Sequence, residues 1–380
     1  MKRKKFLPLS KPLITSAEID AVSSVLRSGY LTTGPKVEEF EKGVEKYLGG
    51  SVHAVALNSC TGGLFLALNA CGIGPGDEVI VPTWTFAASA HVVIWTGAKP
   101  VLCDVDEGSL NIDVRRMKEL ISARTKAIMP VHFAGYPCEM DEITAVARRR
   151  GMVVIEDAAH AIGSVYNGRK IGTIGDATVF SFYATKNLAC GEGGMVVSED
   201  EKMIERIRKA SYFGIDKEAF SRYRKAGRWY YEIEELGYKY NMDSIHAAIG
   251  IVQLKKLNAM SGRRRRIARL YRAHLDDRIR FMTDGDGHYH TYHLFPIRID
   301  RRIIGRNDLI EKLKERNIGA GVHFIPLHRH PYYRSFVRPG EFPVADKAYE
   351  EIISIPMFAG MSDGDAWYVI RTINDILKRR

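Results

Sequence analysis

Short runs of apolar residues alternate with amphipathic stretches over the first 250 positions of the chain. The apolar runs are continuous, which is typical of strands that are buried on both faces. The predicted strands cover residues 52–57, 78–81, 100–105, 127–133, 152–157, 178–182 and 195–197, and the predicted helices cover 61–70, 86–95 and 140–150. This alternation predicts an α/β fold in which a mostly parallel central sheet lies between helices joined by right-handed crossovers.

Beyond this region the apolar spacing becomes that of one long helix over residues 243–274. A strand near 292–297 and helices over 307–316 and 366–377 follow. We therefore expect a large α/β domain over 1–250, including an N-terminal arm, and a smaller α+β domain over 251–380, with the long helix joining them. The basic start of the chain, residues 1–9, has no apolar stretch of the kind found in a signal peptide and predicts a short solvated arm.

Composition narrows the class of protein. No apolar run reaches the roughly 18 residues of a membrane helix, so no membrane partner is expected. The five cysteines lie far apart without a Cys-x-x-Cys pair, which argues against a zinc site or a disulfide framework and favours a reducing, cytoplasmic setting.

The net charge of +11 suits either a nucleic acid or an anionic small molecule as partner. The densest basic run, residues 263–266, would spread around a helix at ~100° per residue rather than form one face. Nucleic acid is therefore not the expected partner.

Candidate chemistry gathers where predicted strands end, which is where ligands bind in such sheets. Asp157 ends one strand, Ser181 and Lys186 end another, and residues 58–61 follow a third. A lysine amine can form a Schiff base with the aldehyde of pyridoxal 5'-phosphate (PLP), and a carboxylate can hold the pyridine nitrogen protonated. The order and spacing of Asp157 and Lys186 predict a PLP site.

A series of motifs then suggests a family. They are Ser28-Gly-Tyr-Leu-Thr-Thr-Gly-Pro35, Asn58-Ser-Cys-Thr61, Pro82-Thr-Trp-Thr-Phe86, Glu156-Asp-Ala-Ala-His160, Ser181 to Asn187, Gly191-Glu-Gly-Gly194, Gly237-Tyr-Lys-Tyr-Asn-Met-Asp243, Val322-His-Phe-Ile-Pro-Leu-His328 with Tyr332-Tyr333, and Phe342-Pro-Val-Ala345. In this order, over nearly the whole chain, the sequence resembles the DegT/DnrJ/StrS-type sugar-nucleotide aminotransferases. These are fold-type-I PLP-dependent transferases, similar to aspartate aminotransferase.

The resemblance implies roles around the cofactor. Lys186 would be the Schiff-base lysine and, once released, the base that moves a proton, while Asp157 would pair with the pyridine nitrogen. Cys60 and Thr61 would present N–H groups at a helix N-terminus to the phosphate, with Ser181 adding a hydroxyl. Asn241 would reach the phosphate from a second subunit, which implies a homodimer with shared active sites.

Two of the implied cofactor contacts have plainer alternatives. Phe86 would lie against the cofactor ring, although an aromatic residue at this position also fits a hydrophobic core. His160 would sit beside the ring, although a buried, hydrogen-bonded structural histidine fits the sequence as well.

The resemblance also implies a reaction. An amino group would pass from L-glutamate to the keto group of a nucleotide-linked ketosugar, at C4 in preference to C3. The candidates near the sugar are Tyr30, Thr32, Tyr183, Glu192, His323 and His328. Arg228 and Lys239 are either partners of a substrate diphosphate or solvated surface charges. The segment 214–235 either closes over the substrate or serves the dimer contact.

Three positions depart from the family pattern. Cys60 stands where glycine is common, Tyr30 where tryptophan is common, and His160 where glutamine often appears. One branch of the family replaces the Schiff-base lysine by histidine and performs dehydration, and Lys186 excludes the chain from that branch. The histidines at 323, 328 and 330 lack an acidic or cysteine companion, so no metal is expected.

Two other functions remain open from the sequence. One is an aminotransferase that acts on a keto-cyclitol, and the other is a regulatory protein that keeps the PLP fold and binds DNA. The second is disfavoured because no helix-turn-helix segment accompanies the complete catalytic set. The sequence leaves undetermined the nucleotide (UDP, GDP or dTDP), the sugar, its stereochemistry and the pathway.

Overall fold

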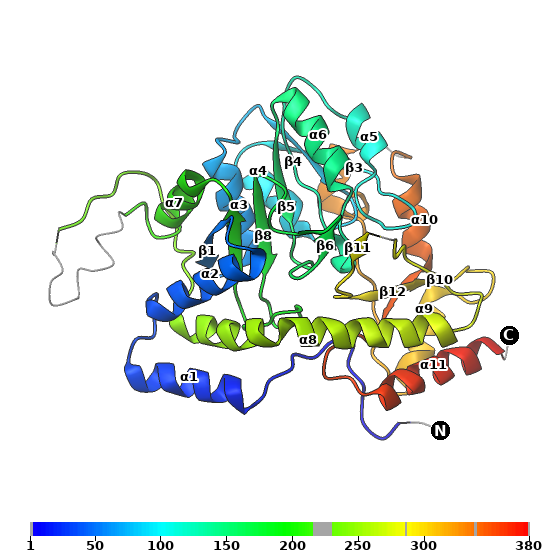
Figure 1. The fold of residues 1–380 in the computed structure, drawn as a ribbon. Helices are drawn as coiled ribbons and strands as arrows, with labels where there is room; N and C mark the ends of the chain where they lie inside the picture. Colours follow the sequence, from blue (N-terminus) through cyan, green and yellow to red (C-terminus); the bar gives the residue numbers. More distant parts are fainter. Residues whose placement is uncertain (1–2, 216–229, 286, 338–339, 379–380) are drawn as a thin grey trace.

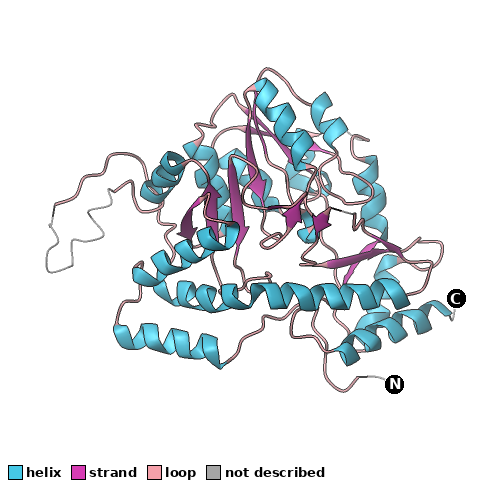
Figure 2. Cartoon of the chain, viewed as in Figure 1, coloured by secondary structure: helices cyan, strands magenta, loops and turns pink. Residues whose placement is uncertain are grey.

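The computed structural model describes residues 3–215, 230–285, 287–337 and 340–378. Its centre is a seven-stranded sheet with the strand order β1-β9-β8-β5-β4-β2-β3 (Figures 1 and 2). The strands are β1 (His53–Leu57), β2 (Glu78–Pro82), β3 (Lys99–Cys103), β4 (Thr125–Ile128), β5 (Val153–Asp157), β8 (Ala177–Ser181) and β9 (Gly194–Ser198). The pairs β2–β3, β2–β4, β4–β5 and β5–β8 are parallel. The predicted mostly parallel sheet is confirmed.

Strand β9 is the exception, because it runs antiparallel to both β8 and β1. Only residues 182–193 separate it from β8, and this loop contains no helix. A parallel return usually runs through a crossover helix, and without one the chain turns back beside β8. That turn carries Lys186.

Helices cover both faces of the sheet, which explains the continuous apolar runs. The helices α3 (Cys60–Ala70), α4 (Ala87–Trp95) and α7 (Glu201–Ala210) pack on one face, and α2 (Pro35–Leu48), α6 (Met140–Arg150) and α8 (Ser244–His274) pack on the other. Successive strand residues point to opposite faces. Val179 therefore belongs to the core on the α3 face of the sheet and Phe180 to the core on the α2 face. The short helix α5 (Val114–Glu119) adds Met117 to the core on the α2 face.

The long helix predicted over 243–274 is confirmed as α8, and the side chain of Asp243 caps it by accepting the amide of His246 at 2.9 Å. Figure 1 shows α8 running from beside α2 to beside α11 (Asp363–Lys378). The helix α1 (Ser16–Ser28) packs against it as well.

A second core lies at the far end of α8. It contains Ile267 of α8 together with the antiparallel sheet β10 (Arg280–Phe281), β12 (Phe295–Arg298) and β13 (Ile352–Ile355) and the helices α9 (Arg306–Glu315) and α11. The remaining elements are β6 (Val165–Tyr166), β7 (Arg169–Lys170), β11 (His288–Tyr289), α10 (Pro343–Glu351), and the 3-10 turns at Phe133–Gly135, Leu327–Arg329 and Pro331–Phe336. The domain boundary at residue 250 stays a prediction.

The N-terminal arm differs from the expectation. Leu7 is buried in the second core and pairs with Ile318, because its amide donates to the carbonyl of Asn317 at 2.8 Å and its carbonyl accepts the amide of Gly319 at 2.8 Å. The prediction of a solvated arm is therefore wrong for this residue. Within the described ranges, no helix is both long and apolar enough to cross a membrane.

Candidate active site

A cavity of about 660 Å³ lies at the carboxyl ends of β2, β5 and β8. Ten of the residues singled out from the sequence line it: Cys60, Thr61, Phe86, Asp157, His160, Ser181, Tyr183, Lys186, Glu192 and His323. Their convergence follows from the sheet, because the carboxyl ends of parallel strands meet at one edge.

Lys186 is positioned by the turn between β8 and β9. Its amide donates to the carbonyl of Tyr183 at 2.8 Å, and the two ends of the turn are tied by the amide of Phe182, which donates to the carbonyl of Gly193 at 2.8 Å. The surrounding protein keeps water from the amine and lowers the pKa of Lys186 to about 8, although the charge of Asp157 opposes this shift. The amine is thus more often unprotonated at neutral pH than an ordinary lysine, as a nucleophile requires.

Asp157 ends β5 with its carboxylate held by two donors. The amide of Ala159 donates to Oδ1 at 3.1 Å, and the hydroxyl of Ser89 donates to Oδ2 at 2.7 Å. The hydroxyl of Thr85 lies 2.7 Å from that of Ser89. Asp157, Ser89 and Thr85 are all buried.

The first turn of α3 faces the same cavity. The side chain of Ser59 caps the helix by accepting the amide of Gly62 at 3.0 Å, and the first N–H groups of a helix have no intrahelical acceptor. Such a helix start attracts an anion. Burial raises the pKa of Cys60 well above its usual value, so its thiol adds no charge. The turn fits the phosphate of PLP, with Thr61 adding a hydroxyl to the cavity wall.

Phe86 and His160 both line the cavity. Phe86 directly precedes α4, and its side chain is 65% exposed, so it is not a core aromatic. His160 is buried with its ring centre 4.3 Å from that of His293, and its Nδ1 has no partner among the described residues. Burial and the charge of Lys186 hold the pKa of His160 well below its usual range, so the ring is neutral.

The candidates for contact with the substrate have side chains that are either exposed or uncharged. Tyr183 is 47% exposed, and Glu192 is exposed as well. The Nδ1 of His323 lies 3.0 Å from the hydroxyl of Ser354. Burial and the charge of Lys186 lower the pKa of His323 to about 4, so it is neutral at physiological pH.

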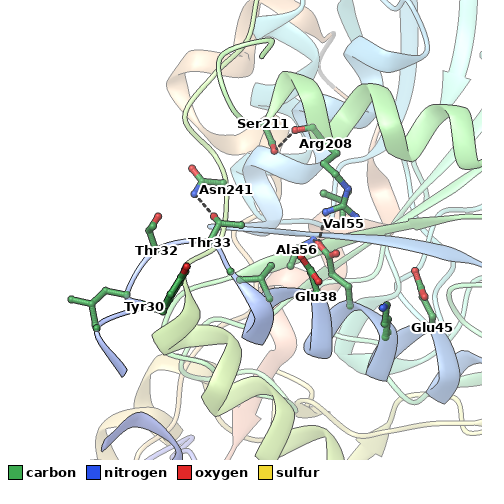
Figure 3. Close-up of a pocket in the computed structure, with 16 residues that line it drawn as sticks. Tyr30, Thr32, Thr33, Glu38, Glu45, Val55, Ala56, Arg208, Ser211 and Asn241 are labelled. Atoms are coloured by element: carbon green, nitrogen blue, oxygen red, sulfur yellow. Dashed lines mark hydrogen bonds and ion pairs between the residues drawn. The ribbon is translucent and has the colours of Figure 1, made fainter. Parts of the chain in front are cut away.

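Three predicted residues lie instead on a second cavity of about 680 Å³ beside α2 and β1, namely Tyr30, Thr32 and Asn241 (Figure 3). The Nδ2 of Asn241 donates to the hydroxyl of Thr33 at 2.6 Å, and its buried Oδ1 has no partner among the described residues. Within one chain, the structure does not bring these three residues into the cavity of Lys186.

His328 departs from its expected place near the sugar. Its Nδ1 lies 2.7 Å from the hydroxyl of Thr83 and its Nε2 lies 3.0 Å from the carboxylate of Asp346, while its ring stacks on Phe342 at 4.4 Å. Both ring nitrogens are thus engaged within the protein, and the residue does not line the cavity.

Of the two candidates for diphosphate binding, Lys239 is described by the structure and does not line the cavity. The amine of Lys239 lies 4.1 Å from the ring centre of Tyr212, away from the cavity lining. Arg228 lies outside the described residues, as does most of the segment 214–235. Among the residues that the structure describes, no group of three or more His, Cys, Asp or Glu side chains is arranged to hold a metal ion.

Several cavity residues were not found from the sequence, namely Ser10, Thr85, His293 and Phe324 on its wall and Ser89 behind it. Ser89 follows Phe86 by three residues, so one helical turn brings it to the same end of α4. That spacing was a usable signal. Ser10 and His293 come from segments whose place depends on the packing of the second core.

A sequence profile described as the DegT/DnrJ/EryC1/StrS aminotransferase family matches residues 12–374. The chain belongs to this family. It is 48% identical to the spore coat polysaccharide biosynthesis protein SpsC of Bacillus subtilis, over 99% of this chain and 98% of that protein.

Solved structures agree with the family and with the fold. The putative sugar aminotransferase Spr1654 from Streptococcus pneumoniae, in its PMP form, gives a TM-score of 0.92 at 33% identity, with 98% of this chain and 99% of that chain covered. Its PLP form gives 0.91 at 32% identity with the same coverage. Helicobacter pylori PseC, an aminotransferase involved in the biosynthesis of pseudoaminic acid, gives 0.91 at 26% identity with 99% and 100% covered. The expected fold and cofactor are confirmed: the chain is a PLP-dependent aminotransferase.

Proposed function

We propose that this cytoplasmic aminotransferase moves an amino group from L-glutamate to the keto group, at C4, of a nucleotide-linked ketosugar. Relatives with sugar-related roles support the substrate class, since Spr1654 is a putative sugar aminotransferase and SpsC is a spore coat polysaccharide biosynthesis protein. The nucleotide linkage and the preference for C4 are what the resemblance of the sequence motifs to the family implies.

The observation that carries the proposal is that Lys186, Asp157 and the first turn of α3 line one cavity. When bound, PLP supplies an electron sink for the charge left as a proton leaves the carbon that bears the amino group. The Lys186 amine, with its pKa lowered to about 8, accepts and returns that proton. The carboxylate of Asp157 accepts the hydrogen bond of the ring nitrogen, and the α3 amides of Cys60 and Thr61 hold the phosphate.

Phe86, whose side chain is exposed, would lie against the cofactor ring. His160, which is neutral, would sit beside the ring and could offer its unpartnered Nδ1 to a hydrogen-bond donor or acceptor of the ligand. Tyr183, Glu192 and His323 would contact the sugar. Glu192 is the acidic residue among them and suits hydroxyl donors of a sugar ring.

The charge around the cavity supports a second subunit. Among the described residues that line the cavity, Lys186 is the only lysine or arginine, so these lining residues supply no other cation for a substrate diphosphate. Large apolar side chains lie exposed just before Asn241 in sequence, with Ile233 at 66% and Leu236 at 79%, and Phe213, at 46%, donates its amide to the carbonyl of Tyr238 in the same segment. Such side chains commonly mark a protein interface. We propose a homodimer in which Asn241, with Tyr30 and Thr32, completes the site of the partner subunit.

The direct test is an assay of UDP-, GDP- and dTDP-linked 4-ketosugars with L-glutamate, read by the mass shift from ketone to amine. The matching 3-ketosugars and a keto-inositol serve as competing substrates, and Lys186→Ala serves as the inactive control. The proposal predicts amination of at least one 4-ketosugar by the wild-type protein alone. Amination of the keto-inositol with no nucleotide-linked ketosugar accepted would contradict it.

A further inference from the structure

Ser89 and Thr85 form a buried chain of hydroxyl groups that ends on Asp157. The proton of Ser89 goes to Oδ2 of Asp157 at 2.7 Å, so Ser89 has no second proton to give. The contact of 2.7 Å between Ser89 and Thr85 therefore has Thr85 as its donor. An ionised carboxylate only accepts hydrogen bonds, and the direction of the whole chain is thus fixed from Thr85 through Ser89 to Asp157.

This chain starts in the turn that carries Phe86. Thr85 precedes Phe86, and Ser89 lies in the first turn of α4, where its amide donates to the carbonyl of Phe86 at 3.3 Å. The N-terminal end of a helix also favours a carboxylate placed beside it. One short segment thus holds both the aromatic ring at the cavity and the hydroxyl that grips Asp157.

The second carboxylate oxygen is held independently. Oδ1 accepts the amide of Ala159 at 3.1 Å. Ala159 follows Asp157 in the chain, whereas Ser89 precedes it and belongs to α4. With one donor fixed on each oxygen, the carboxylate cannot rotate without losing a hydrogen bond. Both hydroxyl side chains are nearly inaccessible, Ser89 at 0% and Thr85 at 2%, so water cannot replace them easily.

We propose that Ser89, oriented by Thr85, is a positioning residue that aims the carboxylate of Asp157 at the ring nitrogen of the cofactor. This rests on the proposed roles of Lys186 and Asp157. When the cofactor is bound, its ring nitrogen and the Lys186 nitrogen belong to one conjugated system. A proton on the ring nitrogen therefore repels a second proton at the Lys186 nitrogen and lowers the pKa of that nitrogen. Losing Ser89 would weaken that repulsion.

The test uses the full-length holoprotein and two readouts apart from turnover. One is the pH midpoint at which the visible absorption band of bound PLP changes, which reports the proton on the Lys186 nitrogen. The other is the PLP dissociation constant. The titratable groups around that nitrogen are Asp157, Cys60, the neutral His160, His293 and His323, and the exposed Tyr183 and Glu192. All of them are unchanged in the variants.

In Ser89→Ala we expect the pH midpoint to rise by about half a unit or more and the PLP dissociation constant to rise about tenfold, as for loss of a hydrogen bond to a charged group. Thr85→Val should move both in the same direction by less, and it decides the question if Ser89→Ala does not fold. The matched control is Ser198→Ala, which removes a buried serine hydroxyl bonded to the carbonyl of Asp176 outside the cavity lining. It should leave the midpoint unchanged.

An unchanged or lowered midpoint in Ser89→Ala, or a shift of the same size in Ser198→Ala, overturns the inference and leaves the proposed function standing. A wild-type protein that shows no visible band with PLP at Lys186 overturns the proposed function itself, and this inference with it.

Discussion

Gly194 stands directly against Cys60, since a Cβ at Gly194 would lie 2.4 Å from the Cys60 amide nitrogen. Gly194 is the first residue of β9, and Cys60 is the first residue of α3. The close approach leaves no room for a side chain, which explains the glycine at the end of the Gly191-Glu-Gly-Gly194 motif. The strand that follows the Lys186 turn is thereby fixed against the helix end that faces the cavity.

Gly194→Ala should displace the first turn of α3 and weaken PLP binding by about tenfold or more, because the amides of that turn would no longer converge on the phosphate. The measurement is the dissociation constant for PLP when the cofactor is added back to the apoprotein. Gly262→Ala is the matched control, since nothing lies within 4 Å of its added Cβ in the middle of α8. It should keep PLP affinity and raise stability by about 0.5–1 kcal/mol. Equal PLP affinity in both variants would refute the role of α3.

The sequence predicts the central fold well, because its signals are local. The continuous apolar runs arise because the strands of the large sheet are buried on both faces. The spacing of apolar residues over 243–274 arises because one side of a long helix is apolar. Leu7 was misjudged, since its burial depends on Asn317 and Gly319, more than 300 positions away. No local pattern distinguishes such a pairing from a free arm.

The site residues also divide into those that local sequence signals reveal and those that depend on distant contacts. Asp157 and Lys186 were found because Asp157 ends β5 and Lys186 follows β8, and the carboxyl ends of these strands meet at one edge of the sheet. His328 was placed near the sugar by its motif, but Thr83 and Asp346 hold both of its ring nitrogens elsewhere. Ser89 went unnoticed although its spacing from Phe86 was a usable signal, because its role shows only in its contact with Asp157.

Lys186 should lower the stability of the apoprotein at neutral pH. Its pKa is about 8 in the folded protein and near 10.5 when unfolded, so the unfolded chain binds more protons between these values and stability rises with pH across that window. Lys186→Met removes this effect. At pH 7 we expect it to stabilise the apoprotein by about 1–3 kcal/mol, allowing for water in the cavity, and the gain should shrink from pH 8 to 10.5.

Urea unfolding at several pH values measures this gain. Lys202→Met, which changes an exposed lysine on α7, is the control and should show no such pH dependence. A gain for Lys186→Met that stays constant from pH 7 to pH 10.5 would be inconsistent with a lowered pKa.

Arg208 and Glu41 protect the free edge of β1. The carboxylate of Glu41 accepts the amide of Ala56 at 2.7 Å and the guanidinium of Arg208 at 2.9 Å, and Arg208 also donates to the carbonyl of Ala54 at 2.7 Å. Figure 3 shows Arg208 and Ala56 at the second cavity. Burial raises the pKa of Glu41, while the positive charge of Arg208 opposes this shift. The ionised form of the carboxylate therefore depends on the arginine.

Arg208→Met should therefore destabilise the protein by about 3 kcal/mol, because it leaves a buried charge without its partner. The double variant Glu41→Gln with Arg208→Met should recover part of that loss. Equilibrium unfolding at one protein concentration measures both. Strictly additive losses would show that the two side chains do not act as a pair.

Asn241 should act across the interface of the proposed homodimer, which subunit mixing can test. Lys186→Ala and Asn241→Ala each damage one component of the site, and a mixed dimer of the two contains one intact site only if Asn241 serves the partner. Random mixing makes half of the dimers mixed, so about a quarter of wild-type activity should return. Activity no greater than that of the unmixed variants would place Asn241 within its own subunit.

The most direct measurement is borohydride reduction of the holoprotein followed by peptide mapping, since reduction fixes PLP to the lysine that holds it. The account predicts one labelled peptide, carrying the cofactor on Lys186, and no label in Lys186→Ala. A cofactor fixed to another lysine, or to none, would contradict the assignment of Lys186.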